Sequence, residues 1–245
     1  MPTFFVASEA INPPIVRITG PLLHHLRRSL RLQPGETLSV TDDRGIRYRT
    51  EIVEVGSQAL IGRILDTTSA PGTAGASILL AQALLKGEKM DWVIQKATEL
   101  GVDRIVPILA THSVVRPRAD RIDHQHARWQ RIALEAAQQS ERWSVPAIEE
   151  PATVAELLSR SKSAASRILL AERSSGSSLA TVPLPGPGGY IWLLIGSEGG
   201  WEEEEVAQAL QHGFTAVTLG PRILRAETAA IAAVSVLQSR LGELG

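Results

Sequence analysis

The sequence contains no cysteine among its 245 residues. This absence excludes disulfide bonds, thiolate metal sites, iron–sulfur clusters and a cysteine nucleophile. It also excludes methylation of a pyrimidine base at C5 through the usual covalent cysteine adduct. If the chain is an enzyme, other side chains must carry its chemistry.

A strong charge imbalance and a long apolar segment are absent as well. The 25 basic and 26 acidic side chains give a net charge of -1, which argues against a uniformly basic nucleic-acid-binding protein but not against a local basic patch. No segment reaches the roughly 18 consecutive apolar residues that a membrane-spanning helix needs. The first residues, MPTFFVASEAINPP, lack the basic flank and the apolar run of a signal peptide. We therefore expect a cytoplasmic protein without a membrane partner.

The first part of the chain alternates apolar and polar side chains in short stretches. This pattern predicts a small β-barrel with one short helix between its first two strands. Residues 67–76, TTSAPGTAGA, are small and turn-forming, and we interpret them as a linker. We therefore expect two domains, residues 1–72 and 73–245. The predicted strands of the first domain are residues 15–20, 36–42, 46–55 and 59–66.

After the linker, apolar strands alternate with helices. This alternation indicates an α/β fold with a parallel sheet covered by helices on both faces. Residues 174–189 are rich in Gly, Pro and Ser, which predicts a flexible surface loop. The predicted strands are residues 77–85, 104–110, 167–172, 190–196 and 216–220, and the predicted helices are residues 88–101, 121–140, 153–161, 202–213 and 226–238.

Three of these strands end in unusual residues, and ligands of parallel α/β sheets bind at such carboxyl ends. The stretches are LLAERSSG, LLIGSEGGWEEEE and VTLGPRILRAET. Gly196, Gly199 and Gly200 let backbone amides approach a ligand closely, just before a helix begins. Alone, such a loop is more often structural than ligand-binding. It matches neither the dinucleotide-binding fingerprint nor the phosphate-binding loop of nucleotide hydrolases.

The last helix begins with a cation, a carboxylate and a hydroxyl, on Arg225, Glu227 and Thr228. One interpretation is functional. The other is that Thr228 or Glu227 caps the helix and that Arg225 pairs with a neighbouring acid. The following residues, AAIAAVSVLQ, are small enough for very close packing. They indicate a tightly enclosed helix or a subunit interface.

The stretches LLIGSEGGWEEEEV and LGPRILRAETAAIAAVSVLQ closely resemble the ribosomal small subunit methyltransferase E family. This family belongs to the SPOUT (trefoil-knot) methyltransferases. HHLRRSLRLQPGETLSVTDDRG resembles its N-terminal PUA-like domain, and LLKGEKMDWVIQKATELGVDRIVPILATHSVV and RWQRIALEAAQQSERWSVPAI resemble the body of its catalytic domain. The four blocks occur in the family's order. The chain departs from the family at Glu141, where glycine is usual, at Ser197, where proline is frequent, and at Trp201-Glu202, where Ser or Thr often opens the helix.

The resemblance implies a trefoil-knotted SPOUT domain with a parallel sheet, preceded by a small PUA-like β-barrel. It implies a homodimer formed through the knotted domain, with S-adenosylmethionine as cofactor. The reaction it implies is methylation of N3 of a uridine in 16S rRNA of the small ribosomal subunit. The cofactor-binding residues it implies are Leu170, Ala171 and Glu172 in the first loop, Ile195, Gly196, Glu198, Gly199 and Gly200 in the second, and Leu219, Gly220, Ile223, Leu224, Arg225 and Thr228 in the third.

For catalysis, we expect Arg225 to stabilise the imide anion of the base and Glu227 to accept the N3 proton. No metal is expected, and the histidines of HQH at residues 124–126 are interpreted as solvated. Two locally basic stretches, residues 17–49 and 104–131, fit RNA phosphates, although each could be only a solvated charged face. The predicted RNA-binding residues are Arg17, Arg27, Arg28, Arg31, Arg116 and Arg142.

Two other functions stay open. Related knotted proteins methylate ribose 2′-hydroxyls, although the PUA-like domain and the LRAET loop favour a base as target. The other alternative is a non-catalytic RNA-binding ribosome-assembly factor, which the intact glycine loop disfavours.

Overall fold

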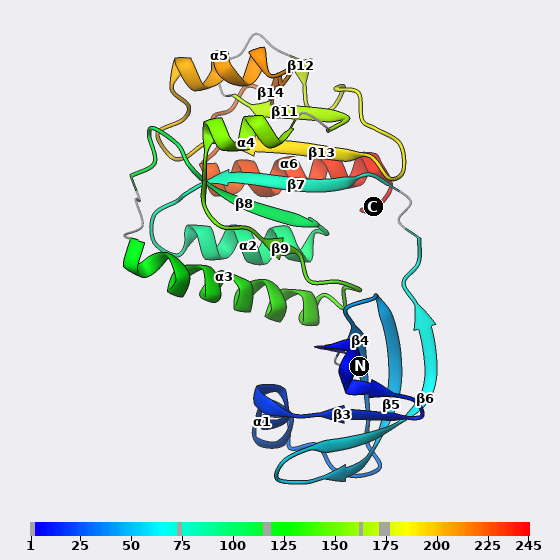
Figure 1. Ribbon diagram of the computed structural model, residues 1–245. Coiled ribbons are helices and arrows are strands. Elements are labelled where there is room, and N and C mark those ends of the chain that lie inside the picture. Colours follow the sequence, from blue (N-terminus) through cyan, green and yellow to red (C-terminus); the bar gives the residue numbers. More distant parts are fainter. Residues whose placement is uncertain (1–2, 73–74, 115–118, 162–163, 172–176) are drawn as a thin grey trace. The chain divides into compact units, whose positions relative to one another are not determined.

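The computed structural model describes residues 3–72, 75–114, 119–161, 164–171 and 177–245 (Figure 1). The chain forms two compact units. One comprises Met1–Gly72 with Ala137–Ser144, and the other comprises Thr73–Ala136 with Val145–Gly245.

The first unit contains a six-stranded sheet in the order β1-β4-β5-β6-β3-β2. Strand β1 runs parallel to β4, and the other neighbours are antiparallel. The four strands expected here are present, but β6 continues through the first three residues of the expected linker. The elements are β1 (Thr3–Val6), a short 3-10 helix (Ser8–Ala10), β2 (Ile11–Asn12), β3 (Ile15–Ile18), α1 (Gly20–Arg28), β4 (Thr37–Asp42), β5 (Ile46–Val55) and β6 (Leu60–Ser69).

Alternating strand residues form the core of this unit together with one face of α1. Leu23 and Leu26 of the helix are buried, and they pack in one cluster with Val16, Leu38 and Ile52 of the strands. The spacing of the two helix leucines places them on one face. The basic residues in the last turn of α1, His25, Arg27 and Arg28, are exposed.

A buried carboxylate organises the turn between β4 and β5. The carboxylate of Asp42 accepts hydrogen bonds from the backbone N–H groups of Arg44 (3.0 Å) and Ile46 (2.9 Å), and from the guanidinium of Arg44 and the hydroxyl of Tyr48. Burial raises the pKa of Asp42, but these hydrogen bonds outweigh it and hold the pKa below its usual range. The turn therefore depends on an ionised Asp42.

Replacing Asp42 by alanine should destabilise the protein by about 2 kcal/mol or more, because buried donors lose their acceptor. Urea unfolding measures the effect. Asp43→Ala is the matched control, since this neighbouring carboxylate is exposed. Equal unfolding midpoints for the two variants would show that Asp42 does not organise the turn.

The segment 137–144 joins the first unit through Arg47. The guanidinium of Arg47 donates to the carbonyl oxygens of Glu141 and Arg142, both at 2.9 Å, and its Cζ lies 3.9 Å from the centre of the Trp143 ring. Glu141 has a φ of 54°, a conformation that glycine adopts at less cost than other residues. The glycine that the resemblance implies at this position would adopt the same conformation more easily than Glu141 does.

The second unit contains a parallel sheet in the order β10-β8-β7-β13-β11-β14-β12, with β9 paired to β8. This arrangement confirms the predicted α/β class. Its strands are β7 (Ser77–Ala83), β8 (Arg104–Leu109), β9 (Ala147–Ile148), β10 (Ala152–Thr153), β11 (Ser166–Leu170), β12 (Ser177–Ser178), β13 (Tyr190–Ile195) and β14 (Thr215–Thr218). Its helices are α2 (Lys89–Glu99), α3 (Ala119–Gln139), α4 (Val154–Arg160), α5 (Glu203–Gln211) and α6 (Ala226–Leu241).

Helices cover both faces of this sheet (Figure 1). Alternate residues of each strand enter opposite cores, as Ile78 and Leu79 of β7 illustrate. The core of Ile78 contains residues of α2, α3 and α6, whereas the core of Leu79 contains residues of α4 and α5. The sheet is therefore apolar on both sides, and polar ligands are expected at its ends.

The loop expected at residues 174–189 is more tightly bound than its composition suggests. Residues 172–176 lie outside the described part, but Leu179 and Val182 are buried. The guanidinium of Arg240 donates to the carbonyl oxygens of both residues, at 2.8 and 2.7 Å. The prediction of a surface position is therefore wrong for Leu179 and Val182, whereas Ser177, Ser178, Ala180 and Thr181 are exposed as expected. Whether the chain forms the trefoil knot implied by the resemblance stays a prediction.

Candidate functional site

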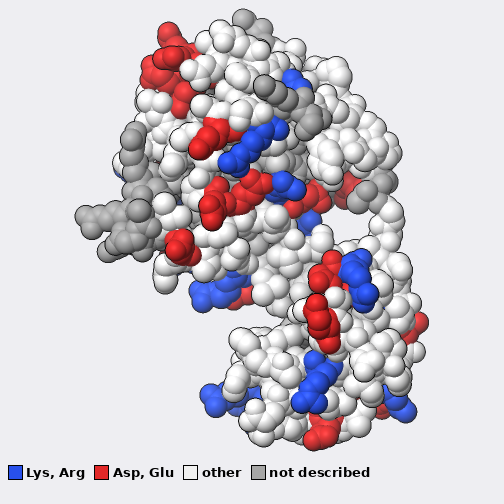
Figure 2. Space-filling view, in the orientation of Figure 1, with Lys and Arg blue, Asp and Glu red and all other residues white. Residues whose placement is uncertain are grey.

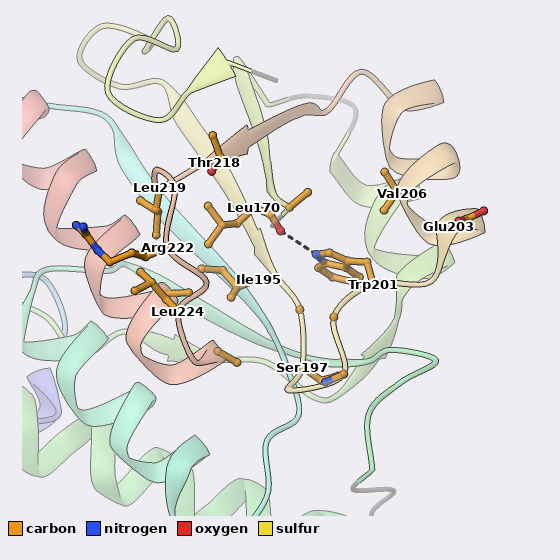
Figure 3. Close-up of a pocket in the computed structure, with 16 residues that line it drawn as sticks. Leu170, Ile195, Ser197, Trp201, Glu203, Val206, Thr218, Leu219, Arg222 and Leu224 are labelled. Atoms are coloured by element: carbon orange, nitrogen blue, oxygen red, sulfur yellow. Dashed lines mark hydrogen bonds between the residues drawn. The ribbon is translucent and has the colours of Figure 1, made fainter. Parts of the chain in front are cut away.

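The carboxyl ends of three neighbouring strands meet at one edge of the second sheet. Strand β11 lies between β13 and β14, and Leu170 at its end pairs with Ile195 and with Val217. A cavity of about 560 Å³ opens at these ends (Figure 3). We call it the strand-end cavity. Its lining residues are Leu170, Ala171, Ile195, Gly196, Ser197, Gly199, Gly200, Trp201, Glu203, Val206, Thr218, Leu219, Arg222, Leu224, Ala226 and Ala229.

The glycine loop after β13 packs closely against neighbouring residues at two of its glycines. A Cβ added to Gly199 would lie 2.8 Å from Cβ of His112, which leaves no room for a side chain, and one added to Gly196 would lie 3.2 Å from Nε1 of Trp201, a tight contact. The loop closes as a tight turn in which the N–H of Gly200 donates to the carbonyl oxygen of Ser197 at 3.0 Å. Gly196, Gly199 and Gly200 line the cavity without side chains, so backbone atoms form this wall.

Trp201 forms a wall that the sequence analysis did not assign. Its indole N–H donates to the carbonyl oxygen of Leu170 at 3.0 Å, and its ring lies against Gly196 (Figure 3). This hydrogen bond joins the first and second loops. The only sequence signal was the departure from the family at Trp201-Glu202, which by itself gives no direction for the ring.

The loop after β8 braces the glycine loop from outside. Thr111 donates to the carboxylate of Glu205 through its N–H (2.9 Å) and its hydroxyl (3.0 Å). Nδ1 of His112 lies 3.1 Å from the carbonyl oxygen of Gly199, and its Nε2 lies 2.7 Å from a carboxylate oxygen of Glu202. Glu202 and Glu205 also form a capping box at the start of α5. The brace and the helix cap share these two carboxylates.

The third loop connects β14 to α6. Leu219 and Leu224 project into the space beside Leu170 and Ile195, whereas the guanidinium of Arg222 points away from it (Figure 3). Arg225 stands in extended conformation at the N-cap of α6. Behind the loop, α6 presents small side chains to the cavity at Ala226 and Ala229. The small residues of α6 thus allow the cavity to extend to the helix itself.

The predicted cofactor residues fall into two groups. Those lining the cavity are Leu170, Ala171, Ile195, Gly196, Gly199, Gly200, Leu219 and Leu224. Glu198, Gly220, Ile223, Arg225 and Thr228 do not line it, and Glu172 lies outside the described residues. Lining residues that the prediction missed are Ser197, Trp201, Glu203, Val206, Thr218, Arg222, Ala226 and Ala229.

A cluster of charges lies next to the loops, centred on Lys89 of α2. Its Nζ lies 2.9 Å from Oε1 of Glu198 and 3.8 Å from Oε2 of Glu227. The N–H of Lys86 also donates to Oε1 of Glu198 at 3.3 Å. The hydrogen bond to Glu198 raises the pKa of Lys89. Burial raises the pKa of Glu198, but the hydrogen bonds from Lys89 and from backbone N–H groups leave this pKa below its usual value.

The lowered pKa of Glu198 predicts how the contribution of this carboxylate to stability changes with pH. A depressed folded-state pKa gives a stabilisation that is complete above the ordinary value of 4.5 and is lost as pH falls through the folded-state pKa. The melting temperature of the native protein should therefore exceed that of Glu198→Gln near neutral pH, and the difference should shrink in acid. Melting curves from about pH 7 to about pH 3 measure it. A difference independent of pH would contradict the ion pair.

The predicted RNA-binding arginines differ in exposure. Arg17, Arg27, Arg28 and Arg31 are exposed in the first unit, where Figure 2 shows basic side chains on the surface of α1. Arg142 is partly buried, and Arg116 lies outside the described residues. In the second basic stretch, three described arginines pair with acids: Arg104 with Glu149, Arg128 with Asp91 and Arg131 with Glu135.

Two other features are absent from the described part of the chain. No group of three or more His, Asp or Glu side chains there could hold a metal ion. None of the described helices is long and apolar enough to cross a membrane.

Two parts of the chain each match a known protein family. Residues 73–238 match the RNA methyltransferase domain, and residues 18–65 match the RNA methyltransferase PUA domain. The second match confirms the predicted PUA-like domain in the N-terminal part.

Individual relatives resemble the chain along nearly its whole length. The ribosomal RNA small subunit methyltransferase E of Mesomycoplasma hyopneumoniae is 36% identical over 228 residues, which cover 93% of this chain and 95% of that protein. The protein of the same name from Synechocystis sp. is 33% identical over 241 residues, covering 96% of this chain and 77% of that protein. A crystal structure of a ribosomal RNA small subunit methyltransferase E from Neisseria gonorrhoeae bound to S-adenosyl methionine is 31% identical, with a TM-score of 0.85 over 98% of both chains.

Both family matches and the full-length relatives agree with the resemblance inferred from the loop motifs. The chain belongs to the ribosomal RNA small subunit methyltransferase E family.

Proposed function

We propose that this protein transfers a methyl group from S-adenosylmethionine to N3 of a uridine in 16S rRNA of the small ribosomal subunit. The observation that carries the proposal is the strand-end cavity, which is built from the three loops that carry the family motifs. A relative of similar fold binds S-adenosyl methionine. An rRNA substrate would place the activity in the cytoplasm, where ribosomes assemble.

The cavity fits this cofactor in size and chemistry. Its volume of about 560 Å³ lies within the usual range for small-molecule sites. Leu170, Ile195 and Leu219 offer apolar contacts for the flat faces of an adenine ring. Gly196, Gly199 and Gly200 line the cavity without side chains, so their backbone groups can bind polar edges of the ligand. We propose that the predicted residues of all three loops hold the cofactor, and that Trp201 adds a further wall.

S-adenosylmethionine, when bound, supplies an electrophilic methyl group for displacement. The chain's task is then to position the uridine, which accounts for much of the catalysis in such transfers. Because N3 lies on the Watson–Crick edge, the base must be unpaired or flipped out of its helix. Arg225 stabilises the imide anion, and Glu227 accepts the proton from N3. These two residues lie two positions apart at the start of α6, with Ala226 between them.

RNA binding is proposed for the exposed arginines of the first domain, with Arg116 and Arg142 as further contacts. Phosphate contacts release condensed counterions, so RNA affinity should fall steeply with salt. Binding that is insensitive to salt would contradict the proposed arginine contacts.

The proposal also includes two domains, residues 1–72 and 73–245, and a homodimer built around α6.

The test of the proposed function is transfer of a radiolabelled methyl group from S-adenosylmethionine to small ribosomal subunits that lack the modification. We expect label in 16S rRNA, and none when the protein is heat-denatured before the labelled S-adenosylmethionine is added. If the protein binds the cofactor but labels neither subunits nor naked 16S rRNA, the proposed reaction is wrong and a non-catalytic role in assembly is favoured.

A further inference from the structure

Lys89 occupies a position between two of the three loops. It is the first residue of α2, and its ammonium group lies within 3.8 Å of carboxylates from two other segments. Glu198 belongs to the glycine loop, between the cavity-lining residues Ser197 and Gly199. Glu227 directly follows Ala226, which lines the cavity from α6. A single cation thus faces one carboxylate from each of two cavity walls.

The two contacts differ in strength. The contact with Glu198 is a charge-assisted hydrogen bond of 2.9 Å. The contact with Glu227 spans 3.8 Å and is an ion pair without a hydrogen bond. Oε2 of Glu227 is buried and has no hydrogen-bond partner within the described part of the molecule. Because an unpaired buried carboxylate oxygen is costly, the nearby ammonium compensates its charge.

We propose that Lys89 is a positioning residue that links the glycine loop to the start of α6 and so fixes both walls for cofactor binding and methyl transfer. This inference rests on the proposed function, in which Glu227 accepts a proton and the glycine loop holds the cofactor. Lys89 does not line the cavity. It acts through Glu198 and Glu227, and Arg225 is the other cation of the cluster.

The ammonium group of Lys89 offsets the repulsion between the carboxylates of Glu198 and Glu227. Glu198 and Glu227 are both largely shielded from solvent, with side-chain exposures of 26% and 15%. Two carboxylates near one another repel when neither is compensated. Without the ammonium group, the glycine loop and the start of α6 would separate, and the wall atoms on both sides would shift together.

The first experiment compares the native protein with Lys89→Met and Lys89→Arg in calorimetric binding of S-adenosylmethionine. We expect Lys89→Met to raise the dissociation constant at least about fivefold and Lys89→Arg to regain most of the affinity. Arg160→Met is the matched control, because it removes a cation paired with Glu149 in the same unit, away from the cavity. An unchanged dissociation constant in Lys89→Met would overturn the proposal.

A double-mutant cycle with Glu198→Gln tests the contact itself. If Lys89 acts through Glu198, the two substitutions together should weaken binding no more than the stronger single one. Fully additive effects would overturn the link. If Lys89→Met does not fold, Glu198→Gln removes the same hydrogen bond from the other side. Because Glu198 is itself a proposed cofactor residue, its effect is read without cofactor from the fluorine NMR signal of Trp201, and an unchanged signal would overturn the link.

A cofactor-free measurement separates this inference from the proposed function. The chain has five tryptophans, and fluorine NMR of protein labelled with 5-fluorotryptophan resolves them, with Trp201 assigned through Trp201→Phe. Lys89→Met should shift or broaden the Trp201 signal, because Trp201 packs on the glycine loop. Arg160→Met should leave this signal in place. If the native protein does not bind S-adenosylmethionine, the proposed function fails. If the Trp201 signal is the same in Lys89→Met, the positioning role fails.

Discussion

Gly199→Ala should weaken binding of S-adenosylmethionine by at least about tenfold, a loss of about 1.4 kcal/mol. The added Cβ would lie 2.8 Å from Cβ of His112 and 3.3 Å from its carbonyl oxygen. Neither atom is the end of a flexible side chain, so the glycine loop itself must move. Close-packed structures absorb such an overlap by shifting backbone, and here the shifted backbone forms a wall of the cavity.

Titration calorimetry and melting curves with and without the cofactor measure this effect. Gly186→Ala is the matched control, because a Cβ at Gly186 meets no atom within 4 Å. We expect the cofactor to raise the melting temperature of the native protein and of Gly186→Ala, and to raise that of Gly199→Ala much less. Equal affinity in all three proteins would show that the glycine loop does not contact the cofactor.

Arg225→Ala and Glu227→Gln should each lower kcat by about a hundredfold or more. Removing a group that stabilises developing charge, or one that accepts a proton, typically costs this much. Arg225 is also a proposed cofactor residue, and Glu227 pairs with Lys89, so both variants are compared at saturating cofactor. The predicted signature is therefore a loss of turnover that saturating cofactor does not restore.

The effect is measured as the single-turnover rate of each variant, with saturating cofactor and 16S rRNA that lacks the modification. Glu204→Gln is the control for the carboxylate-to-amide change, since Glu204 lies exposed on α5. Arg225→Lys keeps the positive charge and should lose less than Arg225→Ala. Full turnover in Arg225→Ala or in Glu227→Gln would exclude that residue from its proposed role.

Most strands and amphipathic helices could be predicted from the sequence, because each has a periodic spacing of apolar residues. Strand β5 begins and ends as expected at residues 46–55, and α6 begins at Ala226 as expected. Strand β1 was missed, since three of its four residues, TFFV, are consecutive apolar residues without alternation. The buried stretch at Leu179 and Val182 was missed because its composition resembles a linker, and the distant Arg240 that binds it has no local signature.

The candidate site was likewise predicted only in part. Glycines and apolar residues at the strand ends predicted the three loops, and many of these residues line the cavity. The contacts of Lys89 with Glu198, Trp201 with Leu170, and Thr111 with Glu205 join residues far apart in the chain. No spacing rule predicts such pairs, because they exist only after the sheet brings its strand ends together. The role of Trp201 in particular depends on the direction of one side chain.

The central claim is most directly tested by mass spectrometry of nucleosides from small ribosomal subunits that lack the modification. The subunits are incubated with this protein and S-adenosylmethionine, and their 16S rRNA is then digested. The account predicts 3-methyluridine, which is absent when the cofactor is left out. A 2′-O-methylated nucleoside in its place would contradict the proposed target atom while leaving the fold and the cofactor site intact.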